Sequence, residues 1–576
     1  MTTARNRARA TGAARPAGAA VAAGTPALAA RTAYAARAIA RAEEPLTAGT
    51  DQYMRRAAQA LATAALAELW EASGAVAEGQ VLVLAGGGNN GGDALLAAAI
   101  LARRGATVEA RLATDHPHAD ALAEARAAGV VIADGPAAEP AAEAARLDLV
   151  IDGLTGIGAS GPLRPRAAAL LAPLIAAGPP GERGFRVLAV DIPSGVGVDD
   201  GALPGPVLAA DRTVTFTCPR GAHLLPPAAP LNGRVDVVDL GLPVPTDGAP
   251  LAIAPDPARL APLLRVPGAT DHKYTRGVVG IHAGSDAYPG AAVLAVSGAI
   301  RAGTGMARIL APRRATDLVL ASRPEAVPAP GRCQAIVVGP GTDPADEPRA
   351  EELREALRAA LRQGRDEGQW AVIDAGALPL LPGLAAEGLA CGPEHVLTPH
   401  AGEAAALLAG LGQPTTREEV EAAPASAVRG LAEETGATVV LKGTPVLIAR
   451  PDGAPLLSLG SGPGWLATAG SGDVLSGALG AVLAAVRADR EGARGGGGEH
   501  DERGIGAVSG LALGDAIALA AAVAVRLHAD AGRLASGEAR GKEGHPIAAM
   551  DVAEHLPQAR QRLRARALPT PRTTKK

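Results

Sequence analysis

The stretch that constrains this chain most reads GWLATAGSGDVLSG, residues 464–477, and an apolar run typical of a helix follows it. Glycines and small hydroxyl residues in such a loop present backbone N–H groups and a helix N-terminus to an anion. Asp473 adds a carboxylate that can take a proton from an attacking hydroxyl group. The pattern therefore indicates phosphoryl transfer. A P-loop is excluded because its Gly-Lys-Ser/Thr ending is missing. A glycine-rich turn capped by Asp473 is the alternative that this loop alone leaves open.

Five motifs precede this loop in a defined order. They read HK at 272–273, GSDAYPGA at 284–291, VGPG at 338–341, LTPHAGE at 397–403 and VVLKGT at 439–444. Together with the loop, they resemble the ADP- or ATP-dependent NAD(P)H-hydrate dehydratase family, a branch of the ribokinase fold. The resemblance covers roughly residues 260–560 and implies a ribokinase-like α/β/α sandwich.

The N-terminal half carries a separate α/β pattern. Short apolar runs, alternating with alanine-rich helical segments, predict strands at 80–85, 107–112, 129–133, 147–151, 186–190 and 213–217. This alternation predicts a doubly wound parallel sheet. Ligands bind such sheets beyond the carboxyl ends of the strands. The run GGGNNGGD, residues 86–93, follows the first predicted strand, and we expect a helix over 94–104 after it.

The glycine spacing in this run allows a second interpretation. Gly86, Gly88 and Gly91 match the dinucleotide-binding fingerprint, and Glu109 stands at a suitable distance for a ribose contact. The alternative is therefore an NAD-dependent dehydrogenase module. The polar side chains of Asn89-Asn90 and Asp93 count against it, because the fingerprint has small neutral residues there.

Three segments together favour a different family. NNGGD at 89–93, DGLTGIG at 152–158 and DIPSG at 191–195 resemble the NAD(P)H-hydrate epimerase family, whose likeness here runs from about residue 33 to 243. The resemblance implies a Rossmann-like domain in which Asp191 is the acid–base residue and Asn90, Asp152 and Ser194 hold a potassium ion. Such oxygen ligands suit a hard cation rather than zinc. Substrate contacts are implied for Asn89, Asn90, Gly91, Gly92, Asp93, Gly156, Ile157, Gly158, Ala159, Ser160, Gly161, Pro162 and Asp191.

In the C-terminal half, the resemblance implies that Asp473 is the catalytic base and that Gly472 faces the phosphates of ADP, the phosphoryl donor, with Mg²⁺. The same likeness assigns contacts with the adenine nucleotide to Lys442, Gly443, Thr444, Pro445, Val446 and Gly472. Contacts with the hydrated dinucleotide are assigned to Ala291, Gly341, His400 and Asp473.

The two resemblances imply a bifunctional repair enzyme that epimerises hydrated NADH and NADPH and dehydrates the S form. A ribokinase-fold small-molecule kinase and a non-catalytic N-terminal scaffold are the alternatives. Four residues depart from the family patterns: Ala94, Arg220, Gly376 and Trp465. Gly376 replaces a common second aspartate, which puts any role of that carboxylate in doubt.

Length and composition agree with two domains. A chain of 576 residues exceeds one ordinary core. The net charge of −4 argues against nucleic-acid binding, and three separated cysteines fit a reducing cytoplasm. We expect no membrane span, and a homo-oligomer. The predicted organisation is a disordered tail (1–32), the epimerase domain (33–245), a linker (246–262), the dehydratase domain (263–563) with a flexible insert (487–506), and a tail (564–576).

Overall fold

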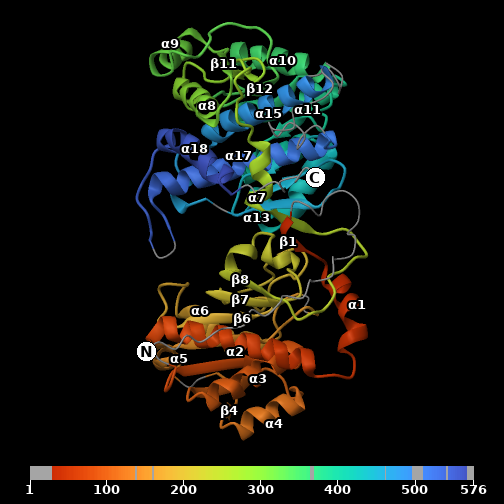
Figure 1. Cartoon of the computed structure of the whole chain (residues 1–576), viewed down its shortest axis with the longest axis vertical. Coiled ribbons are helices and arrows are strands. Elements are labelled where there is room, and N and C mark those ends of the chain that lie inside the picture. The colour runs from red at the N-terminus through yellow and green to blue at the C-terminus, as the bar shows by residue number, and fades with distance from the viewer. Residues whose placement is uncertain are drawn as a thin grey trace, which may run out of the picture.

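The computed structural model describes residues 29–566, apart from 75, 137–138, 159–160, 363–368, 461, 496–509 and 540–541. Within this part of the chain, two α/β domains follow one another (Figure 1). The N-terminal domain holds a seven-stranded sheet with the order β4-β3-β2-β5-β6-β7-β8. The second sheet has ten strands in the order β1-β9-β17-β16-β15-β14-β13-β12-β10-β11.

The N-terminal sheet is parallel throughout and is covered on both faces. Its strands are β2 (Gln80–Ala85), β3 (Thr107–Leu112), β4 (Val131–Ala133), β5 (Leu149–Gly153), β6 (Arg186–Val190), β7 (Arg212–Phe216) and β8 (Arg234–Val238). One face packs against α2 (Gln52–Ser73), α3 (Asn89–Arg103) and α4 (Ala119–Ala127), and the other against α5 (Pro140–Arg146) and α6 (Pro165–Ala176). Helix α1 spans Ala36–Thr47. The predicted doubly wound sheet is confirmed.

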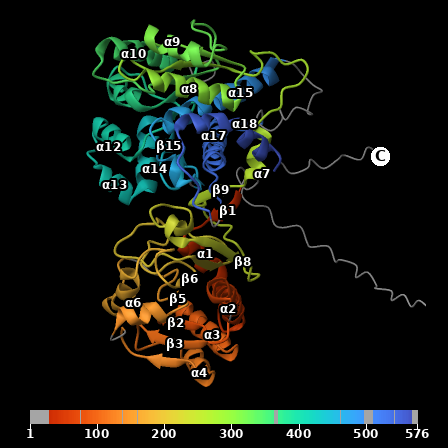
Figure 2. The same ribbon diagram turned by 90° about the vertical axis from the view of Figure 1, so that its left-hand side faces the viewer.

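The C-terminal sheet is also sandwiched between two helical layers (Figure 2). Its strands are β1 (Ala29–Ala33), β9 (Ala252–Pro255), β10 (Val278–His282), β11 (Met306–Ile309), β12 (Ala335–Val338), β13 (Trp370–Ile373), β14 (His395–Leu397), β15 (Thr438–Leu441), β16 (Val446–Ala449) and β17 (Leu456–Leu459). One layer contains α8 (Pro289–Ala302), α9 (Arg313–Ser322), α15 (Ser471–Gly495), α17 (Leu513–Ser536) and α18 (Ala549–Arg564). The other contains α10 (Glu347–Arg362), α11 (Leu381–Ala386), α12 (Ala401–Gly410), α13 (Arg417–Ala422) and α14 (Pro424–Thr435).

Short helical turns complete the structure. They are α7 (Pro257–Leu260) and the 3₁₀ segments Gly221–His223, Ala229–Asn232, Ala261–Leu263, Ala375–Leu380 and Gly464–Leu466. The α/β/α architecture predicted for the C-terminal domain is confirmed.

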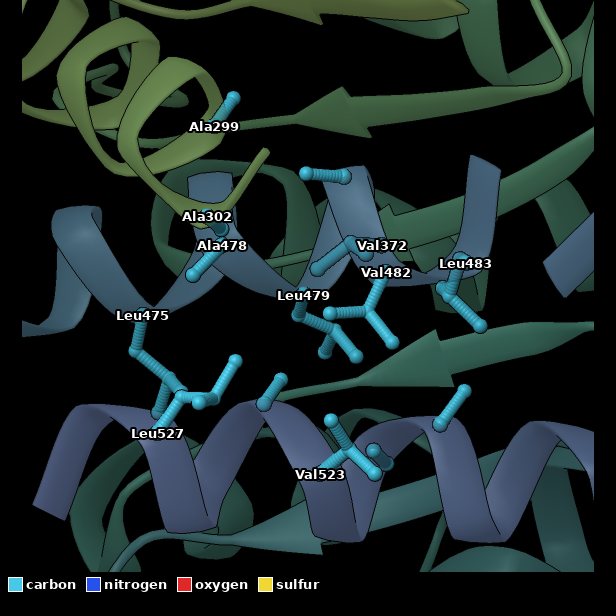
Figure 3. Packing of buried hydrophobic residues seen from close by; sticks show 14 of the residues in the cluster. Ala299, Ala302, Val372, Leu475, Ala478, Leu479, Val482, Leu483, Val523 and Leu527 are labelled. Carbon is cyan, nitrogen blue, oxygen red and sulfur yellow. The ribbon is translucent and has the colours of Figure 1, made fainter. Parts of the chain in front are cut away.

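The core of the C-terminal domain is built from aliphatic and small side chains. Leu475, Leu479 and Val482 of α15 lie between the sheet and the neighbouring helices (Figure 3). A Cβ atom added at Gly477 would come 1.9 Å from the Ala295 carbonyl oxygen, so α15 and α8 pack backbone against backbone. This close approach explains how a chain with 2% aromatic residues fills a large core.

Helix α15 is apolar enough, over Ser471–Gly492, to cross a membrane by length and composition. However, 72% of its most apolar 18-residue window is buried inside the protein. Its apolar side chains are therefore accounted for by the core that they form.

Several predicted boundaries differ from the structure. Residues 29–32, assigned to the tail, belong to β1 (Ala29–Ala33), which pairs antiparallel with β9. Strand β9 and α7 lie within the predicted linker, and β9 also pairs with β17. Backbone pairing with distant strands fixes these short segments, which carry little hydrophobic pattern of their own. Helix α15 continues to Gly495, into the predicted insert. Residues 1–28, 496–506 and 567–576 lie outside the described residues.

Candidate active sites

The N-terminal site lies at the carboxyl ends of β2, β5 and β6, and glycines bring its backbone segments together. A Cβ atom at Gly86 would lie 2.0 Å from the Leu154 carbonyl oxygen, and one at Gly91 would lie 2.1 Å from the Gly86 carbonyl oxygen. Helix α3 consequently begins at Asn89, five residues before the predicted start. Only glycine permits this contact between the first turn of α3 and the loop after β2.

Two cavities meet at this edge of the sheet and share Asn89, Asn90 and Ile157. The larger, of about 480 Å³, is lined mainly by glycines and short loops, including Gly91, Gly156, Gly158, Gly161 and Pro162. The smaller, of about 270 Å³, contains Asp93 and Asp191. The structure thus brings together most of the predicted epimerase residues. Gly92 is not among the lining residues, and Ala159 and Ser160 lie outside the described residues.

Asp191 is held tightly in a left-handed backbone conformation, with φ of 68°. Its Oδ1 atom accepts a hydrogen bond from the Thr215 hydroxyl group at 2.8 Å and lies 3.1 Å from Nε of Arg220. Nε2 of His223 lies 2.7 Å from the Asp191 carbonyl oxygen, and burial lowers the pKa of His223 to about 4. A non-glycine residue at positive φ is costly, and such strain concentrates at functional sites.

Asp93 shares the smaller cavity with Asp191 but has different surroundings. Its side chain is buried, and its Oδ1 atom has no hydrogen-bond partner among the described residues. Burial and the neighbouring Asp191 carboxylate raise the pKa of Asp93 well above its usual value.

The predicted potassium ligands are linked through Thr155, whose backbone N–H donates to the Ser194 hydroxyl group at 3.0 Å. The Asn90 amide group donates hydrogen bonds to the carbonyl oxygens of Thr155 at 3.0 Å and Val190 at 2.9 Å. The fully buried Asp152 carboxylate accepts from the Ser194 hydroxyl group at 2.6 Å and from its backbone N–H at 2.8 Å. The described residues contain no cluster of three or more His, Cys, Asp or Glu side chains suited to a metal. A neutral amide, a hydroxyl group and one carboxylate are nevertheless a hard, weakly charged oxygen set, which fits potassium.

The dehydrogenase alternative finds no support in the position of Glu109. This residue lies three positions before the end of β3, about 10 Å below the binding edge at 3.3 Å per residue. Its carboxylate forms an ion pair with Arg111 at 2.6 Å. Glu109 therefore lies too far from the glycine loop to contact a ribose bound there.

In the C-terminal domain, Asp473 lies in the first turn of α15, where the loop turns at Gly470 with φ of 86°. Burial and the nearby Asp374 carboxylate raise the pKa of Asp473 to about 7, against the opposing effect of Lys442. A Cβ atom at Gly472 would lie 3.8 Å from Lys442 Nζ, so the lysine reaches the helix N-terminus. This arrangement places a base and a cation at an anion-binding helix start.

Lys442 is held by carboxylates on two other elements. Its Nζ atom lies 3.0 Å from Asp374 Oδ1 and 3.4 Å from Glu403 Oε2. The Ser476 hydroxyl group donates to Asp374 Oδ2 at 2.6 Å. Asp374 therefore links Lys442 to α15. The sequence prediction gave Asp374 no role, although its position directly after β13 was a usable signal.

His400 caps α12 and lies at the edge of the site. Its Nδ1 atom accepts hydrogen bonds from the backbone N–H groups of Gly402 and Glu403. In return, the Glu403 carboxylate accepts from the backbone N–H group of His400 at 2.8 Å. This capping role of His400 coexists with an exposed imidazole face.

Ala291 and Gly341, the other two predicted contacts of the hydrated dinucleotide, touch one another, because a Cβ atom at Gly341 would lie 2.2 Å from the Ala291 Cβ.

A third cavity, of about 520 Å³, contains His400 and four of the predicted nucleotide contacts, Lys442, Gly443, Thr444 and Pro445. Val446, Gly472, Asp473, Ala291 and Gly341 are not among its lining residues. Its far wall comes from the other domain, through Pro226, Pro227 and Pro230. These prolines could not be found from the sequence, because no local pattern shows which distant surface they meet.

The departures from the family patterns have local explanations. The Ala94 methyl group is fully buried over Gly153, where an added Cβ atom would lie 2.7 Å away. Arg220 donates to the carbonyl oxygen of Phe216 at 2.7 Å while it faces Asp191. A Cβ atom at Gly376 would lie 2.2 Å from the Thr342 carbonyl oxygen, so the backbone leaves no room for a second aspartate. Trp465 donates from Nε1 to the Glu543 carbonyl oxygen at 2.8 Å.

Comparisons with known proteins agree with this division. The model of the YjeF-related protein N-terminus matches residues 50–222, and the model of NAD(P)H-hydrate dehydratase matches residues 279–550. A bifunctional NAD(P)H-hydrate repair enzyme Nnr from Mycobacterium tuberculosis is 41% identical over 467 residues, covering 77% of this chain and 88% of the relative. An NAD(P)H-hydrate epimerase from Clavibacter michiganensis is 46% identical over 213 residues, covering 35% of this chain and 88% of the relative.

A solved structure of ADP/ATP-dependent NAD(P)H-hydrate dehydratase from Bacillus subtilis, co-crystallised with ATP and Mg²⁺, is 25% identical. It covers 54% of this chain and 97% of its own, with a TM-score of 0.40. The two family models and the relatives matched along most of the sequence lead to one conclusion: the chain belongs to the family of bifunctional NAD(P)H-hydrate repair enzymes.

Proposed function

We propose that this chain repairs hydrated NADH and NADPH. The N-terminal domain interconverts the R and S epimers, and the C-terminal domain dehydrates the S epimer with ADP as phosphoryl donor, giving NAD(P)H, AMP and phosphate. The observation that carries the proposal is that each domain places an aspartate, the buried Asp191 or the half-buried Asp473, at the glycine-rich end of its sheet. The proposed setting is the cytoplasm, and the proposed assembly is a homo-oligomer.

Epimerisation at ring carbon C6 requires loss of its hydroxyl group and addition of water to the opposite face. A positioned carboxylate moves the proton that this exchange requires. Asp191 takes this role, because Thr215 and Arg220 fix its carboxylate within the smaller cavity. The glycine-lined larger cavity accommodates the phosphates of the dinucleotide. Asn90, Asp152 and Ser194 would hold a potassium ion, which when bound would supply a fixed positive charge beside this anionic ligand.

Dehydration requires that the C6 hydroxyl group be phosphorylated first, because hydroxide is a poor leaving group. Asp473 takes the proton of the C6 hydroxyl group, whose oxygen attacks the terminal phosphorus of ADP while the bond to AMP breaks. Lys442 and the N-terminus of α15 offset the negative charge on the transferred group. Phosphate then leaves with the C6–O electron pair, and loss of a C5 proton restores the ring double bond. The Glu403 carboxylate, 3.4 Å from Lys442 Nζ, would be available to hold Mg²⁺, which when bound would neutralise phosphate charge.

The test follows NADH absorbance when purified full-length protein meets R- and S-hydrated NADH with ADP, Mg²⁺ and K⁺. We expect full recovery of NADH, faster than spontaneous epimerisation allows. Asp191→Asn is expected to recover only the S fraction at the enzymatic rate, and Asp473→Asn to recover neither. Recovery of only the S fraction by the unsubstituted protein would refute the epimerase assignment. A phosphorylated product in place of free phosphate would identify a kinase.

A further inference from the structure

The Asp93 carboxyl group of the N-terminal site is buried without a hydrogen-bond partner for one of its oxygens in the described part of the chain. Its side chain is 5% exposed, its Oδ1 atom has no partner among the described residues, and it lines the same 270 Å³ cavity as Asp191. Buried polar atoms in folded proteins nearly always have a hydrogen-bond partner. A buried, unpaired carboxyl oxygen on a side chain that lines a cavity favours the protonated form of that carboxyl group, which can then donate its proton to a ligand.

The charged groups around this cavity are distributed unevenly between the two aspartates. Arg220 and the Thr215 hydroxyl group engage Asp191. His223 contacts the Asp191 backbone and is largely neutral, because burial lowers its pKa to about 4.

The remaining titratable side chains that line the cavity come from α1 and α2. They are Glu43, Glu44 and Tyr53, none of them cationic, and Glu43 accepts a hydrogen bond from Thr217 at 2.7 Å. Asp93 thus faces a carboxylate without a cation of its own, and burial together with Asp191 raises its pKa well above the usual range. Burial and the neighbouring carboxylate therefore favour the protonated form of Asp93.

We propose that Asp93 is the catalytic acid of the epimerisation and acts as the partner of the base Asp191. The proposal rests on the epimerase function proposed above and assigns a second group to its site. The C6–O bond of the substrate breaks, its electron pair stays on oxygen, and the Asp93 proton completes a water molecule. The ring nitrogen lone pair forms the C6=N bond of the iminium ion.

The second half of the reaction restores the substrate with the opposite configuration. The oxygen of a water molecule bonds to the other face of C6, and its released proton goes to Asp191. One water has left and one has been added, so the net change is inversion and transfer of one proton from Asp93 to Asp191. Catalysis from the other epimer begins with this reversed arrangement, and proton exchange with cavity water restores the first one.

The test substitutes Asp93→Asn in the full-length protein and measures R-to-S epimerisation. The chain supplies its own control, because dehydration of purified S-hydrated NADH by the C-terminal domain reports whether the protein is folded and active. We expect kcat for epimerisation to fall about 10²–10⁴-fold, the usual contribution of a general acid, with little change in KM. Dehydration of the S epimer should remain unchanged.

The pH profile separates an acid from a binding group. In the unsubstituted protein, epimerase kcat/KM should fall on the alkaline side as Asp93 loses its proton, and Asp93→Asn should lack this limb. Asp93→Glu, which retains a carboxyl group, should keep the limb and exceed Asp93→Asn in rate. A kcat for Asp93→Asn within about tenfold of the unsubstituted value, or a rise in KM alone, would overturn the assignment. Absence of epimerisation in the unsubstituted protein would instead refute the epimerase function.

Discussion

Burial and the negatively charged neighbour Asp374 raise the pKa of Asp473, whereas the positively charged Lys442 lowers it. The resulting pKa of about 7 suits a general base, because such a base must be unprotonated yet still bind a proton strongly. Asp374 has a second effect, since it also fixes Lys442 at 3.0 Å. One side chain therefore adjusts both the base and the cation beside it.

The first prediction concerns the pH dependence of S-epimer dehydration. A base whose pKa is raised is protonated, and inactive, below that pKa, so kcat/KM should rise with pH through about 7. Asp374→Asn removes a like charge and leaves Lys442 free to pair with Asp473. Both effects lower the pKa of Asp473 and so move the rise in kcat/KM to lower pH. Initial rates measured across pH, with Asp317→Asn at an exposed position of α9 as the matched control, check the shift. A limb that stays in place would contradict the proposed coupling.

Family motifs predicted residues for both sites, but not the space around them. Asp191, Asp473 and the two asparagines follow recognisable strand and loop patterns. The fit of Ala94 over Gly153, and the contact that excludes a side chain at Gly376, depend on backbone segments far away in sequence. Such contacts leave no local signature, so the sequence marked these positions as departures without showing their consequence.

A second prediction follows at Gly376. Gly376→Asp, which installs the residue common in the family, should destabilise the protein by about 1–3 kcal/mol, because its Cβ atom would meet the Thr342 carbonyl oxygen. Gly383→Asp is a matched control, since a Cβ atom there has no neighbour within 4 Å. Denaturant unfolding of the two variants tests the contrast. Equal stabilities would show that the Thr342 loop moves aside.

Helices α8 and α15 show how small residues replace aromatic ones in this core. Gly298 and Gly477 let the two backbones touch, since added Cβ atoms would lie 2.3 Å from the Val474 and 1.9 Å from the Ala295 carbonyl oxygens. This contact orients the start of α15, which carries Asp473. Packing of the two helices therefore positions the base.

The third prediction compares two glycines on one helix. Gly477→Ala should destabilise the protein and slow dehydration, because α15 must shift to admit the methyl group. Gly492→Ala, at an open position of α15, should stabilise it by about 0.5–1 kcal/mol through lower chain entropy. Thermal unfolding and S-epimer dehydration rates distinguish the two. If Gly477→Ala behaves like Gly492→Ala, the contact is not limiting.

Elements with strong hydrophobic runs were predictable from sequence. The bounds of β2 and β6 agree with the prediction because these buried parallel strands are apolar runs between turns. The bounds of β3 (TVEARL) also agree, although its apolar residues alternate with polar ones. The predicted start of α3 was wrong because glycine has a low helix propensity and argued against a helix over 89–93. Contact with the loop after β2 nevertheless requires glycine in the first turn of α3. Strands β1 and β9 depend on distant partners and could not be found locally.

At the scale of the whole molecule, the N-terminal domain contributes to the C-terminal one in two places. Strand β1 extends the C-terminal sheet through β9 (Figure 2). The Ser458 hydroxyl group donates to the Leu224 carbonyl oxygen at 2.6 Å. The loop that follows Leu224 carries the prolines that wall the 520 Å³ cavity. The predicted nucleotide pocket therefore includes part of the epimerase domain.

The fourth prediction tests this shared wall. Pro226→Ala removes about two buried methylene groups from the cavity and should raise the KM for ADP about three- to tenfold. Epimerisation should be unaffected. Pro204→Ala, an exposed position in the same domain, is the control. An unchanged KM for ADP would place the nucleotide elsewhere.

The pairing of β1 with β9 also determines what a protease can separate. The chain crosses between the domains twice, after β1 on the way out and before β9 on the return, and a strand ladder joins the two crossings. A single cut between β8 and β9 would leave the fragments held together by this ladder and by the contact at Leu224. The two halves should therefore co-elute after nicking and come apart only in denaturant, as an enzyme whose parts are tied by two separate passes of the backbone.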